Sequence, residues 1–421
     1  MAVDAPLQDH RGGGTGIPAN ISVMRTALAT TALGVLLAVA LPPAGAAPSR
    51  APLQGVGEGL KLIANLDTGS GTDMEFATIK GREYGFVASR STSEGAPGGL
   101  NVVNVDNPAK PKLAAKLACN LNQGDIQISH DTKTVIMAAD SAGGPDSCLM
   151  LGKLGFMTID ISNPLKPKPL GVAEIARGSH NTTAHPKKPY VYNSDSDQAA
   201  VGEIQIWSIK NPAKPKLVNT ITNPTHSPHD LSFNKDGSMM VTAARTAIHL
   251  YDTSDPENPV LLGATGCPGC YLAHDAKFTP DSAWVIAGDE ASGGGAYPCP
   301  GGALYFYEIV GGRALALRGV YEPGQLLFAQ EQGSLGSCTS HVFDISDDGT
   351  KLAISWYTAG THYLDISNMT GVTVGEQGVG VTELGWFIPE GGDSWSSKFH
   401  KGPYIYSNDI ARGFDVYKIA R

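Results

Sequence analysis

The chain has 421 residues, of which only 17% are charged, and its formal net charge is −9. Because these charges are spread without acidic or basic blocks, the surface carries no electrostatic footprint for nucleic acid, and we expect no nucleic-acid partner. Glycine and proline are abundant, with 51 and 28 residues, which agrees with a secreted globular protein.

The N-terminal region has the pattern of a signal peptide. Arg25 precedes an apolar run from Ala27 to Leu41, and a stretch of prolines and small residues follows and ends at Ala46. A short apolar run before a small-residue cleavage site is typical of an export signal. The run is too short for a membrane-spanning helix, so we expect no membrane span in the mature chain. The sequence therefore predicts a secreted, extracellular protein.

Residues 1–23 have neither a basic region nor any periodicity, and we interpret them as a misassigned start or an unstructured extension. Two parts are therefore predicted. Residues 1–46 form an N-terminal extension and signal peptide, and residues 47–421 form a single folded domain.

That domain repeats one pattern seven times: a short strand with alternating apolar residues, usually an Asn-Pro or Asp-Pro turn, and a second strand. Apolar residues at every second position favour strands over helices. Proline cannot donate to a strand ladder, so it marks the turn. The copies begin at Leu100, Phe156, Ile204, Ile248, Leu304, His362 and Phe414.

Each copy has a leading half, clearest in HDLSFNKDGSMMVTA from His229 and HDAKFTPDSAWVIAG from His274, where a polar turn joins two more strands. One period therefore holds four strands, and its spacing of roughly 45–65 residues is typical of a propeller blade. The predicted fold is all-β, a seven-bladed β-propeller of four-stranded antiparallel blades. The last blade lacks one strand, and we expect Leu60–Leu66 to supply it and close the ring.

The segments VVNVDNP, TIDISNP and YLDISN resemble the LVIVD-repeat family of secreted β-propellers, over essentially the whole mature chain. SPHDLSFNKDG also resembles a turn of related bacterial propeller repeats. The fifth and seventh blades lack the Asn-Pro turn, so they are assigned by position. The resemblance implies a propeller fold and leaves the activity open.

Six cysteines in an exported chain predict three disulfides. All six map to the face of the ring on which the first strands begin, and we expect Cys119 to pair with Cys148. By the same geometry either Cys267 or Cys270 pairs with Cys299, which leaves the partner of Cys338 unassigned. Alternatively, the CPGC segment from Cys267 to Cys270 forms a redox pair or a soft-metal site.

Histidines recur at one position of the leading halves. Aligning these halves places a histidine at the top of the first strand in blades three to six, and Glu75 falls in the same column in blade one. Because the first strand of every blade lines the central channel, these side chains are expected to converge on the axis. The histidines are His180, His229, His274 and His341. Three further histidines, His130, His185 and His400, map to the opposite face and are expected to be solvated.

Imidazoles gathered around one point suit copper, zinc, iron or nickel. The arrangement is similar to the copper-binding propeller oxidases of the methanethiol oxidase and selenium-binding family, which implies the kind of site and no reaction. We therefore predict a metal or small-ligand site, with copper as the implied metal and a copper-dependent oxidase as its catalytic form. The predicted ligands are His180, His229, His274, His341 and Glu75.

Acidic residues near the same face could orient the ligand histidines, although Asp and Asn also cap turns in such loops. These residues are Asp140, Asp195, Asp289, Glu290 and Asp409. The sequence contains no Gly-x-Ser-x-Gly elbow, nucleotide-binding glycine loop or His-Glu-x-x-His helix.

The histidine column has a structural alternative. Tryptophan-aspartate repeat propellers use a recurring histidine only to fix loops, but a residue of that kind would be expected in all seven blades. The competing functional hypothesis is a noncatalytic extracellular scaffold whose loops bind a protein or a glycan.

Overall fold

The computed structural model describes residues 53–91, 98–119, 121, 123–141, 148–194, 202–291, 297–331, 336–369 and 380–420. Residues Ala47–Arg421 form one compact unit. The predicted extension and signal peptide, residues 1–46, lie outside the described residues and stay a prediction. Among the described residues, no helix is long and apolar enough to cross a membrane.

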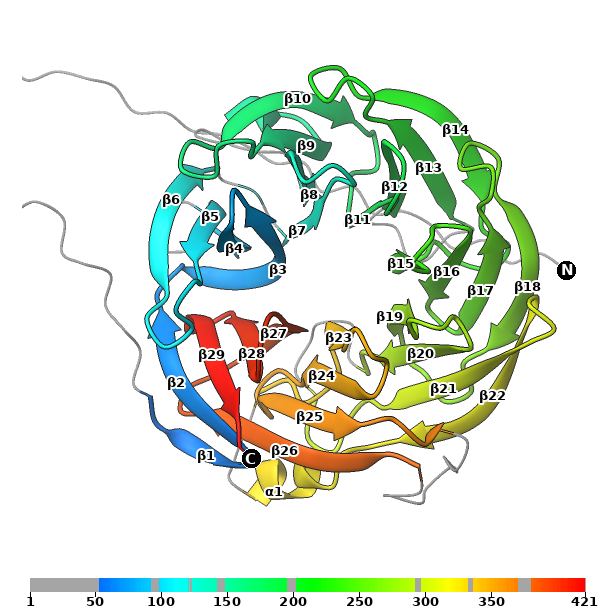
Figure 1. Cartoon of the computed structure of the whole chain (residues 1–421). Coiled ribbons are helices and arrows are strands. Elements are labelled where there is room, and N and C mark those ends of the chain that lie inside the picture. The colour runs from blue at the N-terminus through cyan, green and yellow to red at the C-terminus, as the bar shows by residue number, and fades with distance from the viewer. Residues whose placement is uncertain are drawn as a thin grey trace, which may run out of the picture. The chain divides into compact units, whose positions relative to one another are not determined.

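Seven antiparallel sheets surround a central axis, which confirms the predicted seven-bladed propeller (Figure 1). Blade one contains β3 (Ser70–Ile79), β4 (Arg82–Arg90), β5 (Gly99–Asn104) and β6 (Lys112–Ala118). Blade two contains β7 (Gln123–Ile128), β8 (Thr134–Ala139), β9 (Gly155–Asp160) and β10 (Lys168–Glu174). Blade three contains β11 (Asn181–Ala184), β12 (Tyr190–Ser194), β13 (Glu203–Ser208) and β14 (Lys216–Thr222). Blade four contains β15 (Asp230–Phe233), β16 (Met239–Ala244), β17 (Ala247–Asp252) and β18 (Val260–Gly266).

The remaining blades follow the same order. Blade five contains β19 (Ala273–Phe278), β20 (Trp284–Asp289), β21 (Leu304–Val310) and β22 (Ala314–Tyr321). Blade six contains β23 (Phe343–Ile345), β24 (Lys351–Ser355), β25 (Thr361–Asp365) and β26 (Thr382–Pro389). Blade seven contains β27 (Ser394–Phe399), β28 (Tyr404–Asp409) and β29 (Gly413–Ile419). Within the described ranges, two short helices lie between strands, the 3-10 helix η1 (Cys148–Met150) and α1 (Gln325–Glu331).

The position of a strand in its blade determines how much of it is buried. The first strands line the axis, whereas the fourth strands form the rim (Figure 1). Every residue of β8 is buried, whereas no residue of β18 on the rim is fully buried. In every blade the register shifts by one residue between the third strand and the outer strand, as in the shift between Leu250 and Tyr251. Such bulges bend a strand, which suits the curved rim.

The ring closes as predicted. β2 (Leu60–Leu66) pairs antiparallel with β29 and becomes the outer strand of blade seven. A buried polar group supports this junction: Arg412 Nε donates to Asp415 Oδ2 at 2.9 Å, and Asn65 Nδ2 donates to Asp415 Oδ1 at 2.8 Å. The sequence did not predict β1 (Gly55–Glu58), which pairs with β26 and gives blade six a fifth strand.

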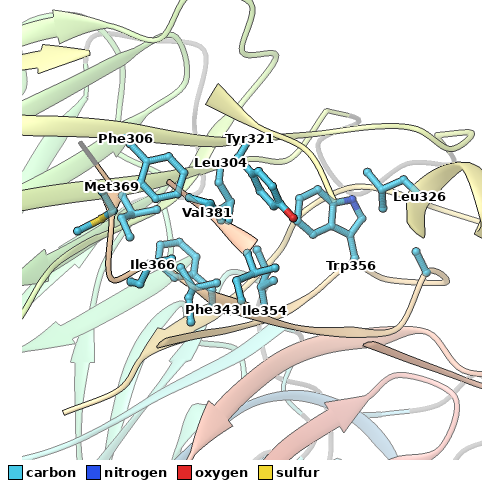
Figure 2. Packing of buried hydrophobic residues seen from close by; sticks show 14 of the residues in the cluster. Leu304, Phe306, Tyr321, Leu326, Phe343, Ile354, Trp356, Ile366, Met369 and Val381 are labelled. Atoms are coloured by element: carbon cyan, nitrogen blue, oxygen red, sulfur yellow. The ribbon is translucent and has the colours of Figure 1, made fainter. Parts of the chain in front are cut away.

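The hydrophobic core lies between blades, where the faces of adjacent sheets pack. Figure 2 shows the cluster between blades five and six, in which Phe306 of β21 and Phe343 of β23 belong to one buried group with Trp356. Trp356 also donates its indole N–H to the Gly301 carbonyl at 2.8 Å, so its single polar atom is satisfied. Leu326 of α1 joins this cluster, which fixes the helix against the ring.

Three disulfides form. Cys119 pairs with Cys148, as predicted. The predicted bridge from Cys267 or Cys270 to Cys299 is wrong. Cys267 pairs with Cys270 inside one tight turn, in which the Cys270 N–H donates to the Cys267 carbonyl. Cys299 instead reaches Cys338, because the Cys338 N–H donates to the Tyr297 carbonyl and holds the two loops together.

Candidate functional site

The four predicted histidines lie side by side at one end of the channel. His180, His229 and His341 lie just before the first strands of blades three, four and six, and His274 lies in β19. Their ring centroids are 4.3 Å apart for His180 and His229, 3.9 Å for His229 and His274, and 4.1 Å for His274 and His341. Equivalent positions in successive blades therefore form a continuous arc of imidazoles, which we call the axial cluster.

Hydrogen bonds assign the tautomers of three of these rings. A backbone carbonyl can only accept, so His229 Nδ1 donates to the His274 carbonyl at 3.2 Å, and His341 Nδ1 donates to the Trp395 carbonyl at 2.6 Å. His180 Nδ1 lies 3.2 Å from Asp140 Oδ2 and donates to that carboxylate. A neutral imidazole that carries its proton on Nδ1 presents a lone pair at Nε2. These three rings therefore offer Nε2 as an acceptor or metal ligand.

His180 Nε2 and His229 Nε2 lie 2.7 Å apart. By the tautomers assigned above, both atoms carry lone pairs, which repel each other at this distance unless a positive species lies between them or beside them. Either a shared proton or a metal ion would remove the repulsion.

The carboxylate of the axial cluster comes from Glu290, directly after β20. Glu290 Oε2 lies 3.7 Å from His274 Nε2, and Glu290 Oε1 lies 3.9 Å from His341 Nε2. The Tyr357 hydroxyl donates to Glu290 Oε1 at 2.6 Å. Ligand atoms of His229, His274 and Glu290 all lie within 4.8 Å of one another, close enough to hold one metal ion. Sequence reasoning assigned Glu290 only an orienting role.

Glu75, which the sequence placed in the histidine column, lies elsewhere. The column positions of blades two and seven are Gly124 and Trp395, and Glu75 is level with the residues three positions later, Gln127 and Lys398. Gln127 Nε2 donates to Glu75 Oε1 at 3.2 Å, and Lys398 Nζ donates to the same oxygen at 2.6 Å. Thr72 occupies the column position of blade one, since its hydroxyl donates to the Gly124 carbonyl at 3.3 Å. The alignment of blade one was therefore three residues out of register.

Burial keeps three of the imidazoles neutral. It lowers the pKa of His229 and His274 well below the usual value, with neighbouring histidines adding to the effect, and it lowers the pKa of His341 to about 3. Neutral imidazole is the form that binds metals. Burial, together with the nearby Glu290 carboxylate, raises the pKa of Tyr357, so its hydroxyl stays a donor.

The axial cluster is most open at His180. The His180 side chain is 12% exposed and Asp140 is 15% exposed, whereas the side chains of His274, His341 and Glu290 are at most 4% exposed. A ligand would therefore reach the axial cluster from the His180 side.

Aromatic rings close the other end of the axial cluster. Trp395, at the column position of blade seven, lies 4.2 Å from the His341 ring, and the Arg90 guanidinium lies 4.4 Å above Trp395. This stack shields the buried histidines from solvent on that side.

The other acidic residues that the sequence analysis named as orienting groups have different roles. Asp140 contacts His180 and is placed to orient it. Asp289 accepts from the amides of Tyr271 and Leu272, and Asp409 accepts from the amides of residues 393, 411 and 412, so both cap turns. Asp195 lies outside the described residues.

On the opposite face, His130 is exposed, as expected. The expectation of a solvated His185 is wrong: its side chain packs under Gly237 and beside Phe233, and the residue is only 1% exposed. His400 is half-buried, because its Nε2 bonds Glu83 Oε2 at 3.0 Å.

Comparison with solved structures gives the fold. The β-propeller domain of Cps50 (Swd1) from Myceliophteria thermophila has a TM-score of 0.60 at 8% identity, over 86% of this chain and 100% of that chain. The periplasmic gluconolactonase PpgL of Pseudomonas aeruginosa has a TM-score of 0.57 at 11% identity, over 78% and 95%. A functionally unknown protein from Desulfotomaculum acetoxidans has a TM-score of 0.53 at 17% identity, over 75% and 89%.

At these identities the likeness shows a β-propeller and nothing of the activity. No family model and no curated protein matches the sequence. The resemblance to LVIVD-repeat proteins and to the methanethiol oxidase family therefore rests on the repeat residues and the histidine column alone.

Proposed function

We propose that this chain is a secreted metal-binding propeller that holds one transition-metal ion in the axial cluster. His229, His274 and Glu290 are the proposed ligands, and His180 or His341 completes the set. The observation that carries the proposal is the contact between His180 Nε2 and His229 Nε2 at 2.7 Å, where two lone pairs need a cation. Glu290 would partly neutralise the charge of that cation.

Imidazole nitrogens with one carboxylate oxygen suit copper, zinc, nickel or ferrous iron. Copper is the metal that the resemblance to the propeller oxidases implies, and a copper-dependent oxidase is the catalytic form of the proposal. A bound ion of this kind would supply Lewis acidity or a redox couple. The protein would contribute the fixed Nε2 geometry, the Asp140 contact that orients His180 and the shield of Trp395.

The test is metal content measured by mass spectrometry on secreted protein with its disulfides intact. Wild type is expected to retain one ion per chain, and the double variant His229→Ala, His274→Ala is expected to lose it. His249→Ala is the matched control, because His249 is fully buried but lies in the third strand of blade four, outside the axial cluster. A metal-free wild type that takes up no added copper, zinc, nickel or iron would refute the proposal.

A noncatalytic interaction scaffold is the second candidate. It is favoured by the internal partners of the same groups: Tyr357 already donates to Glu290, and His341 already donates to the Trp395 carbonyl. In that case the axial cluster would share a proton and stiffen the ring, and the exposed loops would bind an extracellular protein or glycan. Three disulfides are compatible with such a location. Failure to bind metal would favour this candidate.

A further inference from the structure

The end of the channel opposite the axial cluster contains a cavity of about 410 Å³, within the usual range of small-molecule sites. We call it the lower pocket. It is lined by Glu75, Gln127, Lys277, Asp344 and Lys398. Each of these residues lies three positions after the column position of its own blade. The lower pocket is therefore a second level of the same channel, built from different side chains.

Groups of both signs line the lower pocket. Three acidic residues and three lysines face it: Glu75, Asp230, Asp344, Lys235, Lys277 and Lys398. The two deepest lysines have carboxylate partners. Lys398 Nζ lies 2.6 Å from Glu75 Oε1 and 3.5 Å from Asp73 Oδ1, and Lys277 Nζ lies 3.1 Å from Asp275 Oδ2. Asp344 Oδ2 accepts from the Phe399 amide at 3.0 Å. A charged ligand would therefore meet like charges on one side.

The lining mixes donors and acceptors. Lysine ammonium groups only donate and carboxylates only accept, whereas Gln127 can do both. A ligand that fits this lining must donate and accept at several points without a net charge, because burying an unpaired charge is costly. Hydroxyl groups meet this requirement, since each is both donor and acceptor.

Three phenylalanines also line the lower pocket: Phe76 in blade one, Phe233 in blade four and Phe399 in blade seven. The Phe76 ring stacks on His400 with centroids 4.6 Å apart. A ligand with polar and apolar parts could place its C–H groups against these rings and its hydroxyls toward the charged side chains.

We propose that the lower pocket binds a neutral polyhydroxylated small molecule, a sugar or a related polyol. This site is independent of the metal proposal, since none of the metal-binding side chains named above lines it. The ligand would lie against Lys398, Gln127 and Asp344.

The probes are D-glucose, maltose and myo-inositol, with spermidine as a cationic comparison and citrate as an anionic one, titrated by calorimetry into the secreted full chain. At least one polyol is expected to bind, whereas spermidine and citrate are not expected to bind.

Two variants test the position of the site. Gln127→Leu removes a donor and an acceptor, and Ala184→Phe fills the cavity; each is expected to weaken polyol binding tenfold or more. Gln205→Leu is the matched control, since Gln205 lies on a third strand outside the lower pocket.

The proposal is overturned if no polyol binds, if spermidine or citrate binds instead, or if polyol binding survives both pocket variants in chains whose circular dichroism matches wild type. Titrations are repeated after dialysis against a chelator. Unchanged polyol binding there separates this site from the axial cluster, whereas loss of binding with the metal would place the polyol at the cluster and refute the lower-pocket site.

Discussion

Asp140 Oδ2 lies 3.2 Å from His180 Nδ1, and the opposite nitrogen of the same ring faces His229 at 2.7 Å. A carboxylate, an imidazole and a second imidazole thus form a chain across blades two, three and four. The carboxylate fixes the tautomer of the first ring and raises the basicity of its inner nitrogen. The orientation of the most exposed histidine of the axial cluster is therefore set by a residue of the neighbouring blade.

This relationship predicts that Asp140→Asn lowers metal affinity about 10- to 100-fold without unfolding the ring, as other losses of an orienting partner do. Affinity is measured by competition with a chromophoric chelator. Asp252→Asn is the control, because Asp252 only caps an exposed turn through the Ser254 amide. Equal affinities in both variants would show that Asp140 does not tune the site.

The two reassigned disulfides should differ in their effect on stability. Cys299 and Cys338 are 39 residues apart and buried in a core cluster, so replacing both with alanine should cost about 4 kcal/mol from loop entropy. Cys267 and Cys270 are 3 residues apart, and the same replacement should cost about half as much or less. Urea unfolding of both double variants measures this. A larger loss for the Cys267 and Cys270 variant would contradict the loop argument.

Stability should fall in mild acid because of buried histidines outside the axial cluster. Burial lowers the pKa of His249 to about 4, and its Nδ1 lies 3.0 Å from Thr242 Oγ1 and 3.3 Å from Asn223 Nδ2. The unfolded chain binds this proton near pH 6.5 and the folded chain only near pH 4. Stability is therefore complete above pH 6.5 and is lost as the pH falls toward 4, by up to about 3 kcal/mol.

His249→Gln is expected to flatten the pH dependence of the urea midpoint over this window, at the cost of some stability at pH 7. The exposed His130 provides the control, and His130→Gln should leave the slope unchanged. A slope that is the same in wild type and His249→Gln would assign the acid sensitivity to other groups.

The polar group at the ring closure should be sensitive to single changes. Asp415→Leu leaves the buried Arg412 guanidinium without its carboxylate and should cost about 3–5 kcal/mol. The exposed pair of Arg318 and Glu308, with nitrogen and oxygen 2.6 Å apart, is the comparison, and Glu308→Leu should cost about 1 kcal/mol or less. Thermal unfolding of both variants measures the two losses of stability. Equal losses would mean that burial does not strengthen the ion pair at the ring closure.

The propeller could be predicted from the sequence because its information is local and repeated. Alternation of apolar residues marks each strand, and Pro108 and its equivalents mark the turns. The repeat count leaves the last blade one strand short, so the extra strand Leu60–Leu66 could be assigned to it. β1 carries no such signal: all four of its residues are exposed, and it pairs through its backbone.

The site was predicted in part for the same reason. Four histidines at one repeat position had to meet, because equivalent positions in a ring are neighbours. Glu290 follows a second strand and enters the axial cluster from outside the repeat column, so an alignment of columns could not find it. The sequence did offer one indication of its role: Glu290 is an acidic residue at the end of the strand that pairs with the strand of His274. In blade one, the bulge between Gly71 and Met74 interrupts the alternation, so only the inter-blade contacts show that Thr72 and not Glu75 occupies the column position.

The pairing of β2 with β29 has a consequence for how the protein is made. β29 is the last described strand to be synthesised, whereas its partner β2 is the second. Paired residues such as Leu60 and Ile419 can therefore meet only after β29 has been made. Contacts so distant in sequence form slowly, since the chain must lose much of its freedom first. Until β29 is in place, β2 and β28 each keep an unpaired strand edge. Such edges can pair with other chains, so closing the ring also protects the protein from edge-to-edge aggregation.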